Sequence, residues 1–319
     1  MYRECGQEHH LNRRDFLLRT AAAAAGATAL GLPRRPAAAQ EPAAPAAAPL
    51  LPTIRLGEHD VTRLVAGYNP IGGFSHTTLD MTRHMLEYFT AERTAEFLLR
   101  CERAGINTWQ FDVTDKTVEA IRLAREQGCG IQLICLHGGG LGAAELTEVM
   151  KQGPIAIVHH GGVTDGLFRA GKAQQVHDYV KKVHDQGVLA GVSSHCPDNV
   201  KRIADEGWEN DLFMTCFYYL TRPREEMQQQ LGKVPVGEPF FESDAEEMTA
   251  VVQQVPQPCL GFKILAAGQK CWSAASVEQC FQYAFGRIKP TDGVIVGLYP
   301  QFADEISENA GYARKYGTV

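Results

Sequence analysis

The chain has 319 residues, of which 45% are hydrophobic and 21% are charged, and its formal net charge is −6. This is the composition of an ordinary soluble globular protein, and the length suits one α/β barrel of roughly 250 residues with an additional segment. No basic stripe with interleaved aromatic residues occurs, so we do not expect a nucleic-acid partner.

The amino-terminal residues have the pattern of an export signal. Residues 12–18 (NRRDFLL) resemble the twin-arginine motif, an alanine-rich apolar stretch spans 21–32, and 37–39 offer a small-residue cleavage site. We therefore expect residues 1–39 to be a signal peptide for the twin-arginine export machinery, and the mature protein to be periplasmic or otherwise extracytoplasmic. The apolar stretch is shorter than the ~20 strongly apolar residues that a membrane span needs, so we expect no stable span after cleavage.

An Ala/Pro-rich segment follows at residues 40–52, and its composition predicts a disordered linker before a folded domain at 53–319. Eight of the nine cysteines come after the expected cleavage site, and no Cys-x-x-Cys pair occurs. An oxidising compartment permits disulfides. Cys135 and Cys216, however, lie in apolar strand-like runs, which favours buried free thiols.

Strand-like and helical patterns then alternate eight times. Residues 54–56, then 57–60, then 61–66 have the pattern of a hairpin that runs into the first barrel strand. The strands are predicted at 61–66, 106–111, 131–136, 155–158, 188–192, 212–217, 260–266 and 294–296, and a long polar insertion at 221–242 is predicted to be a loop. Eight such units predict an α/β fold, a (β/α)8 TIM barrel with an N-terminal β-hairpin. A doubly wound open sheet is disfavoured by the strand count and by the absence of a G-x-G-x-x-G turn.

Histidines stand at the carboxyl ends of three successive predicted strands: His137, the pair His159 and His160, and His195. Barrel enzymes place their chemistry at these ends, so we expect at least one of His137, His159 and His160 to contact a small-molecule ligand. A single such histidine is more often a hydrogen-bonded structural residue. His137, His159 and His195, with Asp112, are also candidates for a divalent metal site, although no local ligand spacing supports it.

Lys263 lies in an otherwise apolar strand-like run. If its side chain points into the barrel, burial lowers its pKa, which suits a base or an imine-forming nucleophile. If it points outward, it extends between helices toward solvent. Tyr218 and Tyr219 follow the sixth strand, where a tyrosine either stacks on a flat ring or packs at the rim.

Several segments together resemble the aldo/keto reductase superfamily. They are residues 104–109 (AGINTW), 190–195 (AGVSSH) and 217–222 (FYYLTR), and Gly297 followed by Glu308 and Asn309. The resemblance implies an NAD(P)-linked oxidoreductase with His159 as its catalytic histidine. It places the dinucleotide against Ser193, Ser194, Tyr218, Gly297, Glu308 and Asn309.

The chain departs from the family at the other catalytic positions. The aspartate position falls on Gln110, the tyrosine position near Asp115, and the lysine position near Leu136 or His137. Reduction of a carbonyl needs a proton donor beside the carbonyl oxygen, so the usual catalytic tetrad is largely lost.

The leading hypothesis is an exported, divergent aldo/keto-reductase-like oxidoreductase that acts on a small polar carbonyl compound or sugar-like metabolite. In it, His159 orients or protonates the substrate oxygen with help from His137, and Lys263 is a third catalytic candidate. One alternative is a metal-dependent lyase, isomerase or hydrolase on the same barrel. Another is a non-catalytic ligand-binding barrel.

Overall fold

The computed structural model describes residues 48–138 and 144–318. The expected signal peptide, most of the expected linker, and Gly139 and Gly140 after the third strand lie outside these ranges. No helix within the described ranges is long and apolar enough to cross a membrane.

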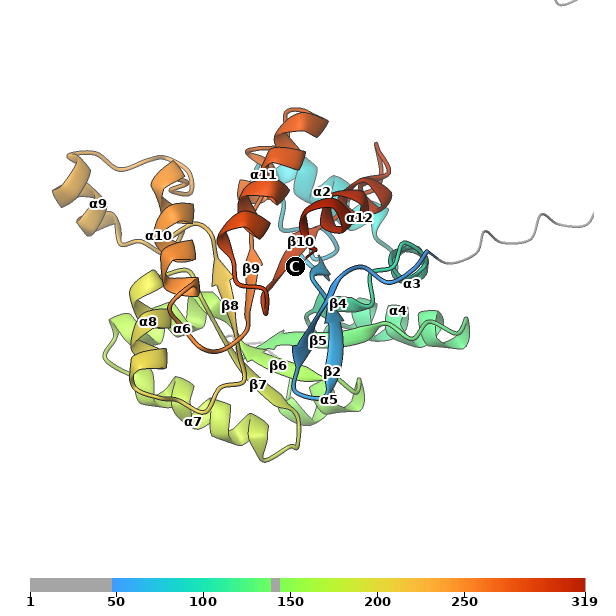
Figure 1. Ribbon diagram of the computed structural model, residues 1–319, viewed down its shortest axis with the longest axis horizontal. Coiled ribbons are helices and arrows are strands. Elements are labelled where there is room, and N and C mark those ends of the chain that lie inside the picture. Colours follow the sequence, from blue (N-terminus) through green and yellow to red (C-terminus); the bar gives the residue numbers. More distant parts are fainter. Residues whose placement is uncertain (1–47, 139–143, 319) are drawn as a thin grey trace, which may run out of the picture. The chain divides into compact units, whose positions relative to one another are not determined.

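Eight parallel strands form the centre of the described domain. They are β3 (Leu64–Gly67), β4 (Thr108–Phe111), β5 (Gln132–His137), β6 (Ala156–His159), β7 (Leu189–Ser194), β8 (Leu212–Cys216), β9 (Cys259–Phe262) and β10 (Gly293–Gly297). They close into a barrel in the order β10-β3-β4-β5-β6-β7-β8-β9 (Figure 1). The predicted (β/α)8 barrel is therefore confirmed.

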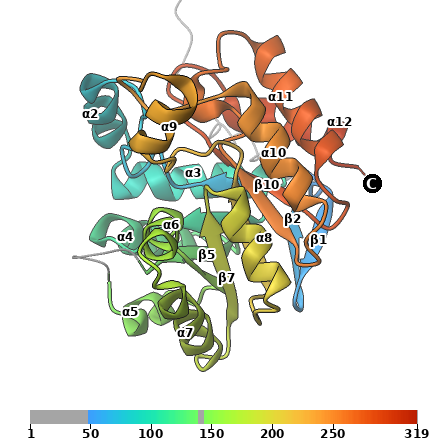
Figure 2. The same ribbon diagram turned by 90° about the vertical axis from the view of Figure 1, so that its left-hand side faces the viewer.

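The predicted amino-terminal hairpin is also confirmed, as β1 (Thr53–Leu56) paired with β2 (His59–Thr62). Ile54, Leu56 and Val61 are buried in one cluster with the inward-facing residues of the barrel strands. The hairpin therefore covers the amino-terminal end of the barrel, and Figure 2 shows it in blue at the right of the view, beside the barrel strands. Only the carboxyl ends of the strands remain for a ligand to approach.

An outer layer of helices surrounds the strands (Figure 1). It comprises α3 (Ala91–Arg103), α4 (Asp115–Glu126), α5 (Leu146–Lys151), α6 (Gly161–Arg169), α7 (Ala173–His184), α8 (Pro197–Asp205), α10 (Glu242–Val252), α11 (Ala274–Arg287) and α12 (Glu305–Tyr316). The sequence analysis did not predict α6, because it begins with two glycines, which are weak helix formers.

Further short helices interrupt the connections that follow the strands. They are α2 (Leu79–Tyr88), α9 (Arg224–Leu231) and the 3-10 turn η2 (Ala266–Gly268). Helix α2 has no buried residue, so its sequence lacks the apolar stripe from which a helix could have been predicted. The segment 221–242, predicted to be a loop, contains α9, so that prediction was wrong in part. In both views α9 lies far from the hairpin (Figures 1 and 2).

Two apolar clusters show which face each strand residue occupies. The inner cluster holds Val65, Ile134, Val158, Met214 and Leu260, whereas the neighbouring residues pack outward against the helices. Side chains alternate along a strand, so this assignment fixes the direction of every residue at a strand end. It decides which of the predicted site residues face the barrel axis.

Candidate active site

His137 and His159 lie on the outer face of their strands, toward the helices. Leu136 and Val158 belong to the inner cluster, so the residues that follow them face away from the barrel axis. Both imidazole rings contact the ring of Tyr179 on α7, with centroid separations of 5.9 Å and 4.9 Å. These two of the strand-end histidines therefore do not face the barrel axis, where we expected a ligand to bind.

Hydrogen bonds occupy both nitrogens of His137. Nε2 lies 2.6 Å from the carbonyl oxygen of Ala144, so it donates, and Nδ1 lies 2.5 Å from Tyr179 Oη, so it accepts. His159 Nδ1 lies 2.7 Å from Thr164 Oγ1, whose hydroxyl donates to the His160 carbonyl. Burial, with the neighbouring His160 and His137, lowers the pKa of His159 to about 4. The ring of His159 is therefore neutral at neutral pH, and hydrogen bonds within the protein hold both rings in place.

His195, in contrast, sits on the inward-facing register and pairs with a buried carboxylate. Its Nδ1 lies 2.9 Å from Asp165 Oδ2, and its backbone N–H donates to the same oxygen. Ser194, Asn199 and Thr221 also donate to this carboxylate. Burial opposes ionisation, but the hydrogen bonds from His195 and Ser194 hold the pKa of Asp165 below its ordinary value.

The pairing with Asp165 fixes the tautomer of His195. A carboxylate only accepts, so Nδ1 carries the proton and Nε2 keeps its lone pair. Nε2 has no hydrogen-bond partner among the described residues, and 13% of the side chain is exposed. The geometry is that of a base held in place by a carboxylate.

A second hydrogen-bonded chain joins three further side chains. Lys263 Nζ lies 2.7 Å from His76 Nε2, and His76 Nδ1 lies 2.8 Å from Glu238 Oε2. Nδ1 therefore donates to the carboxylate, and Nε2 accepts from the lysine. Burial is the main cause that lowers the pKa of Lys263. The arrangement of nucleophile, base and orienting carboxylate is the one that activates a side chain for attack.

The backbone places both partners of the lysine–histidine contact in an uncommon conformation. His76 has φ 54° and Lys263 has φ 60°. Strict alternation after the inward-facing Phe262 would turn Lys263 toward the helices, and the left-handed conformation brings its amine to His76 instead. Such a residue is held at a cost of about 1–3 kcal/mol, and these conformations gather at functional sites.

The two groups lie together at the carboxyl ends of the strands. Burial first, then the charges of His195 and Lys263, lower the pKa of the intervening His160. His160 Nδ1 is buried and has no partner in the described part of the chain. Phe262 packs its ring edge-on against His195, with centroids 5.5 Å apart. We name the set the mouth cluster: His76, His160, Asp165, His195, Glu238 and Lys263.

The structure does not assemble the predicted metal ligands. Within residues 48–138 and 144–318, no group of three or more His, Cys, Asp or Glu side chains has metal-binding geometry. His137 and His159 face outward, His195 faces inward, and Asp112 accepts a hydrogen bond from the Val113 backbone. The four candidate ligands therefore do not come together, because their side chains point to different faces of the barrel. They are His137, His159, His195 and Asp112.

The residues that the family resemblance assigns to a dinucleotide do not fit one as placed. Ser193, Ser194, Tyr218 and Asn309 are buried. The Ser194 hydroxyl is engaged by Asp165, and the ring of Tyr218 packs edge-on against Phe240. Of this set only Gly297 and Glu308 are exposed.

Sequence reasoning missed His76, Asp165 and Glu238. Each comes from a separate connection and belongs to no local motif. Glu238 lies within the polar insertion that was predicted to be a loop over the mouth, which was the nearest available signal. Lys263 was singled out correctly as unusual, but its direction depends on a left-handed residue that no pattern indicates.

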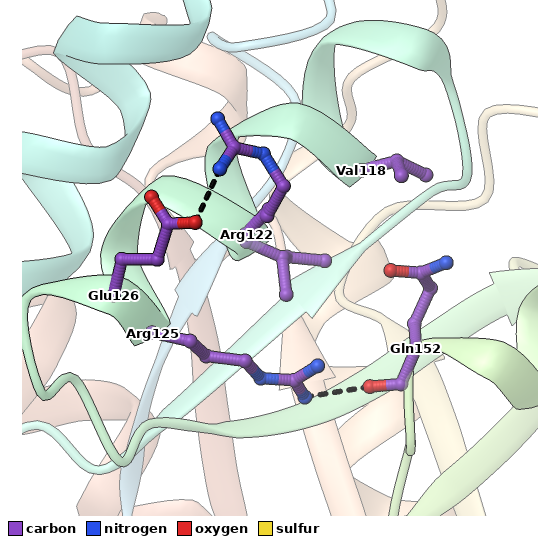
Figure 3. A pocket seen from close by; sticks show the side chains of 6 residues that line it. Val118, Arg122, Arg125, Glu126 and Gln152 are labelled. Atoms are coloured by element: carbon purple, nitrogen blue, oxygen red, sulfur yellow. Dashed lines mark hydrogen bonds and ion pairs between the residues drawn. The ribbon is translucent and has the colours of Figure 1, made fainter.

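A separate hollow of about 490 Å³ lies on the outer surface beside α4 (Figure 3). Arg122 pairs there with Glu126, and Arg125 donates to the carbonyl of Gln152. The hollow is shallow and exposed to solvent, and it does not lie at the carboxyl ends of the strands. We assign no function to it.

Comparisons with known proteins bear on the fold. No family model matches the chain, and no curated protein matches it. Similar solved structures include Gox0644 in its apo form, at 11% identity over 85% of this chain and 94% of that one, with a TM-score of 0.50. The glycerol dehydrogenase AKR11B4 from Gluconobacter oxydans is 10% identical over 84% of this chain and 90% of that one, with a TM-score of 0.48. A truncated 3-deoxy-D-arabino-heptulosonate 7-phosphate synthase from Thermotoga maritima is 13% identical over 83% of this chain and 90% of that one, with a TM-score of 0.44. At 11% identity, the likeness to Gox0644 shows the barrel fold alone.

Proposed function

We propose that the protein is an acid–base enzyme that moves a proton beside the carbonyl group of a small polar carbonyl compound or sugar-like metabolite. The observation that carries this proposal is the mouth cluster. It combines a base fixed by a carboxylate, His195 with Asp165, and an amine held by a second histidine, Lys263 with His76. Isomerases, epimerases and lyases need such a pair.

His195 is the proton-transfer residue in this proposal. Its free Nε2 takes a proton from the carbon next to the carbonyl and returns it elsewhere. Asp165 stabilises the imidazolium that forms, because its carboxylate already accepts from Nδ1. Positioned bases of this kind contribute typically 10²–10⁴-fold to a rate.

Lys263 acts at the carbonyl oxygen. Removal of the neighbouring proton leaves negative charge on that oxygen, and a desolvated cation or N–H donor stabilises it far better than water does. His76 receives or returns the proton of Lys263, and Glu238 stabilises the charged form of His76.

Hydride transfer is not part of this proposal, since the catalytic tetrad is largely lost and four of the six residues assigned to the dinucleotide are buried. His159 and His137 have structural roles here. A non-catalytic binding barrel is the remaining alternative, and turnover separates it from an enzyme.

Proton exchange with solvent tests the proposal. In D2O, wild-type protein should exchange the proton next to the carbonyl in at least one of a panel of small hydroxyaldehydes and hydroxyketones, followed by 1H NMR. His195→Asn should slow this exchange about 100-fold or more. The matched control is His184→Asn, which breaks a His–Asp pair of 2.7 Å in an outer helix and should leave the rate unchanged. Equal exchange in wild type and His195→Asn would overturn the proposal. Ligand-induced stabilisation without any exchange would indicate the binding barrel.

We also propose that the protein is exported by the twin-arginine route to the periplasm, on the strength of residues 12–39. Replacing Arg13 and Arg14 by lysine should retain the protein in the cytoplasm when the full chain is expressed and the cells are fractionated. Replacing Arg34 and Arg35 in the same way is the control and should leave export intact. Normal export of the first variant would contradict this proposal.

A further inference from the structure

We propose that Lys263 acts covalently, with its Nζ forming an imine with the aldehyde or ketone group of the substrate. This inference rests on the proposed function for its site and substrate class. It adds a bond between enzyme and substrate, and it restricts the substrate to true aldehydes and ketones, since esters and amides do not form imines.

The partners of Lys263 favour a free amine over a permanent cation. No carboxylate in residues 48–138 or 144–318 lies within 4.0 Å of its Nζ. Its partner is His76 Nε2 at 2.7 Å, an acceptor that also lies 3.4 Å from Asn69 Nδ2. Because Glu238 accepts from Nδ1, the other ring nitrogen is free to take the lysine proton.

Another lysine of the same chain shows what a structural role looks like. Lys289 Nζ lies 3.1 Å from the buried carboxylate of Asp292 and donates to the carbonyl oxygen of Val252. Lys289 is thus paired with a carboxylate and a carbonyl oxygen. Within the described ranges Lys263 has neither kind of partner, and burial lowers its pKa, which increases the neutral fraction at neutral pH.

The surroundings also supply what carbonyl attack requires. Phe262 places an apolar ring against His195, and Lys263, the next residue, has a left-handed backbone and an amine that contacts His76. A side chain that merely reached solvent between helices would not need a strained backbone.

The step balances without an oxidant or a reductant. Lys263 gives a proton to His76 Nε2, and its lone pair then attacks the carbonyl carbon, so a C–N bond forms. The C=O double bond becomes a C–O single bond, and a proton passes from the attacking nitrogen to that oxygen, which becomes a hydroxyl. His76 Nε2 then returns its proton to the hydroxyl, the C–O bond breaks, water leaves, and a protonated imine remains, while His195 keeps its lone pair for the later proton transfer. Water returning to the imine carbon reverses the sequence and releases the product.

Reductive trapping tests the imine. Wild-type protein is incubated with glycolaldehyde or dihydroxyacetone and treated with sodium borohydride, whose hydride adds to the imine carbon. Intact mass should increase by the mass of the probe less one oxygen atom, once per chain, and peptide mapping should place the adduct on Lys263. Lys263→Arg keeps the charge and should lose this adduct. Lys233→Met removes an exposed lysine of the insertion and should retain it.

A second variant tests the role of the histidine without removing the lysine. Glu238→Gln leaves Lys263 and His76 in place, and it should slow trapping about 10-fold because the protonated form of His76 loses its carboxylate. Circular dichroism establishes that each variant is folded. A trapping rate equal to that of wild type would remove His76 and Glu238 from the mechanism and overturn the inference as stated.

The two proposals fail in distinguishable ways. Proton exchange without an adduct on Lys263 would overturn the imine and leave the acid–base function standing. Adducts spread equally over surface lysines, with no loss in Lys263→Arg, would likewise overturn it. An adduct on Lys263 without proton exchange would support the imine and refute the proposed proton transfer. Absence of both would end both proposals.

Discussion

Asp165 determines the chemical state of His195, because its carboxylate holds the proton on Nδ1 and leaves Nε2 as a base. Asp165→Asn should therefore lower the solvent-exchange rate by about 100-fold while the protein remains folded. The same substitution at Asp211, the partner of His184, is the control and should have no effect on exchange. An unchanged rate in Asp165→Asn would refute this role.

His159 makes stability depend on pH in a defined window. Its folded-state pKa is about 4, below the ordinary value of 6.5, because burial disfavours the charged ring. The unfolded chain therefore binds a proton that the folded chain does not, so stability falls as the pH decreases from about 6.5 to about 4. The total effect is on the order of 3 kcal/mol.

His159→Gln should flatten this dependence. Chemical denaturation at several pH values between 4.5 and 7 should give a shallower loss of unfolding free energy for the variant than for wild type. Parallel curves would show that the ring of His159 does not titrate in this way.

The start of α6 is packed too tightly for any side chain larger than glycine. A Cβ on Gly161 would lie 2.8 Å from Ser193 Oγ, which must shift, and 3.0 Å from His195 Cε1, so the ring of the base must give by a few tenths of an ångström. Gly161→Ala should reduce proton exchange at least 10-fold, since a shift of about 1 Å in a catalytic group costs up to 10²-fold.

Gly166, in the same helix, is the matched control. A Cβ there meets no atom within 4 Å. Gly166→Ala should leave exchange unchanged and raise the unfolding free energy by up to about 1 kcal/mol, because alanine is the better helix former. Equal effects of the two substitutions on exchange would contradict the packing argument.

The elements themselves were predictable from the sequence, and the site only in part. Eight alternations of apolar runs with helical stretches were enough to predict the barrel. When both faces of a strand are apolar, however, the sequence does not show which residues point inward. His137 and His159 were therefore expected at the mouth and lie outside it. Asp165, His76 and Glu238 come from separate connections, and only tertiary structure brings them together.

Arg63 immediately precedes β3 and links this first strand of the ring to the segment before the last strand, β10. Its buried guanidinium donates to the backbone carbonyls of Asp292, Lys289 and Gly317. Arg63→Leu leaves these carbonyls without donors and should lower the unfolding free energy by about 3–5 kcal/mol.

Arg55 provides the comparison, because it forms an exposed ion pair with Asp60. Arg55→Leu should change the unfolding free energy by less than about 1 kcal/mol. Chemical denaturation of both variants measures the difference. A similar small effect for Arg63→Leu would show that the ring is held closed by strand pairing and apolar packing alone.

Competitive labelling of lysines tests the central claim most directly. Trace acetic anhydride is applied to the folded protein across a range of pH, and mass spectrometry follows the acetylation of each lysine peptide. Burial beside His76 predicts that the reactivity of Lys263 titrates with a pKa below the ordinary lysine value of about 10.4, and that a bound hydroxycarbonyl compound protects it. An ordinary lysine pKa at Lys263, with no protection by any such compound, would contradict the account.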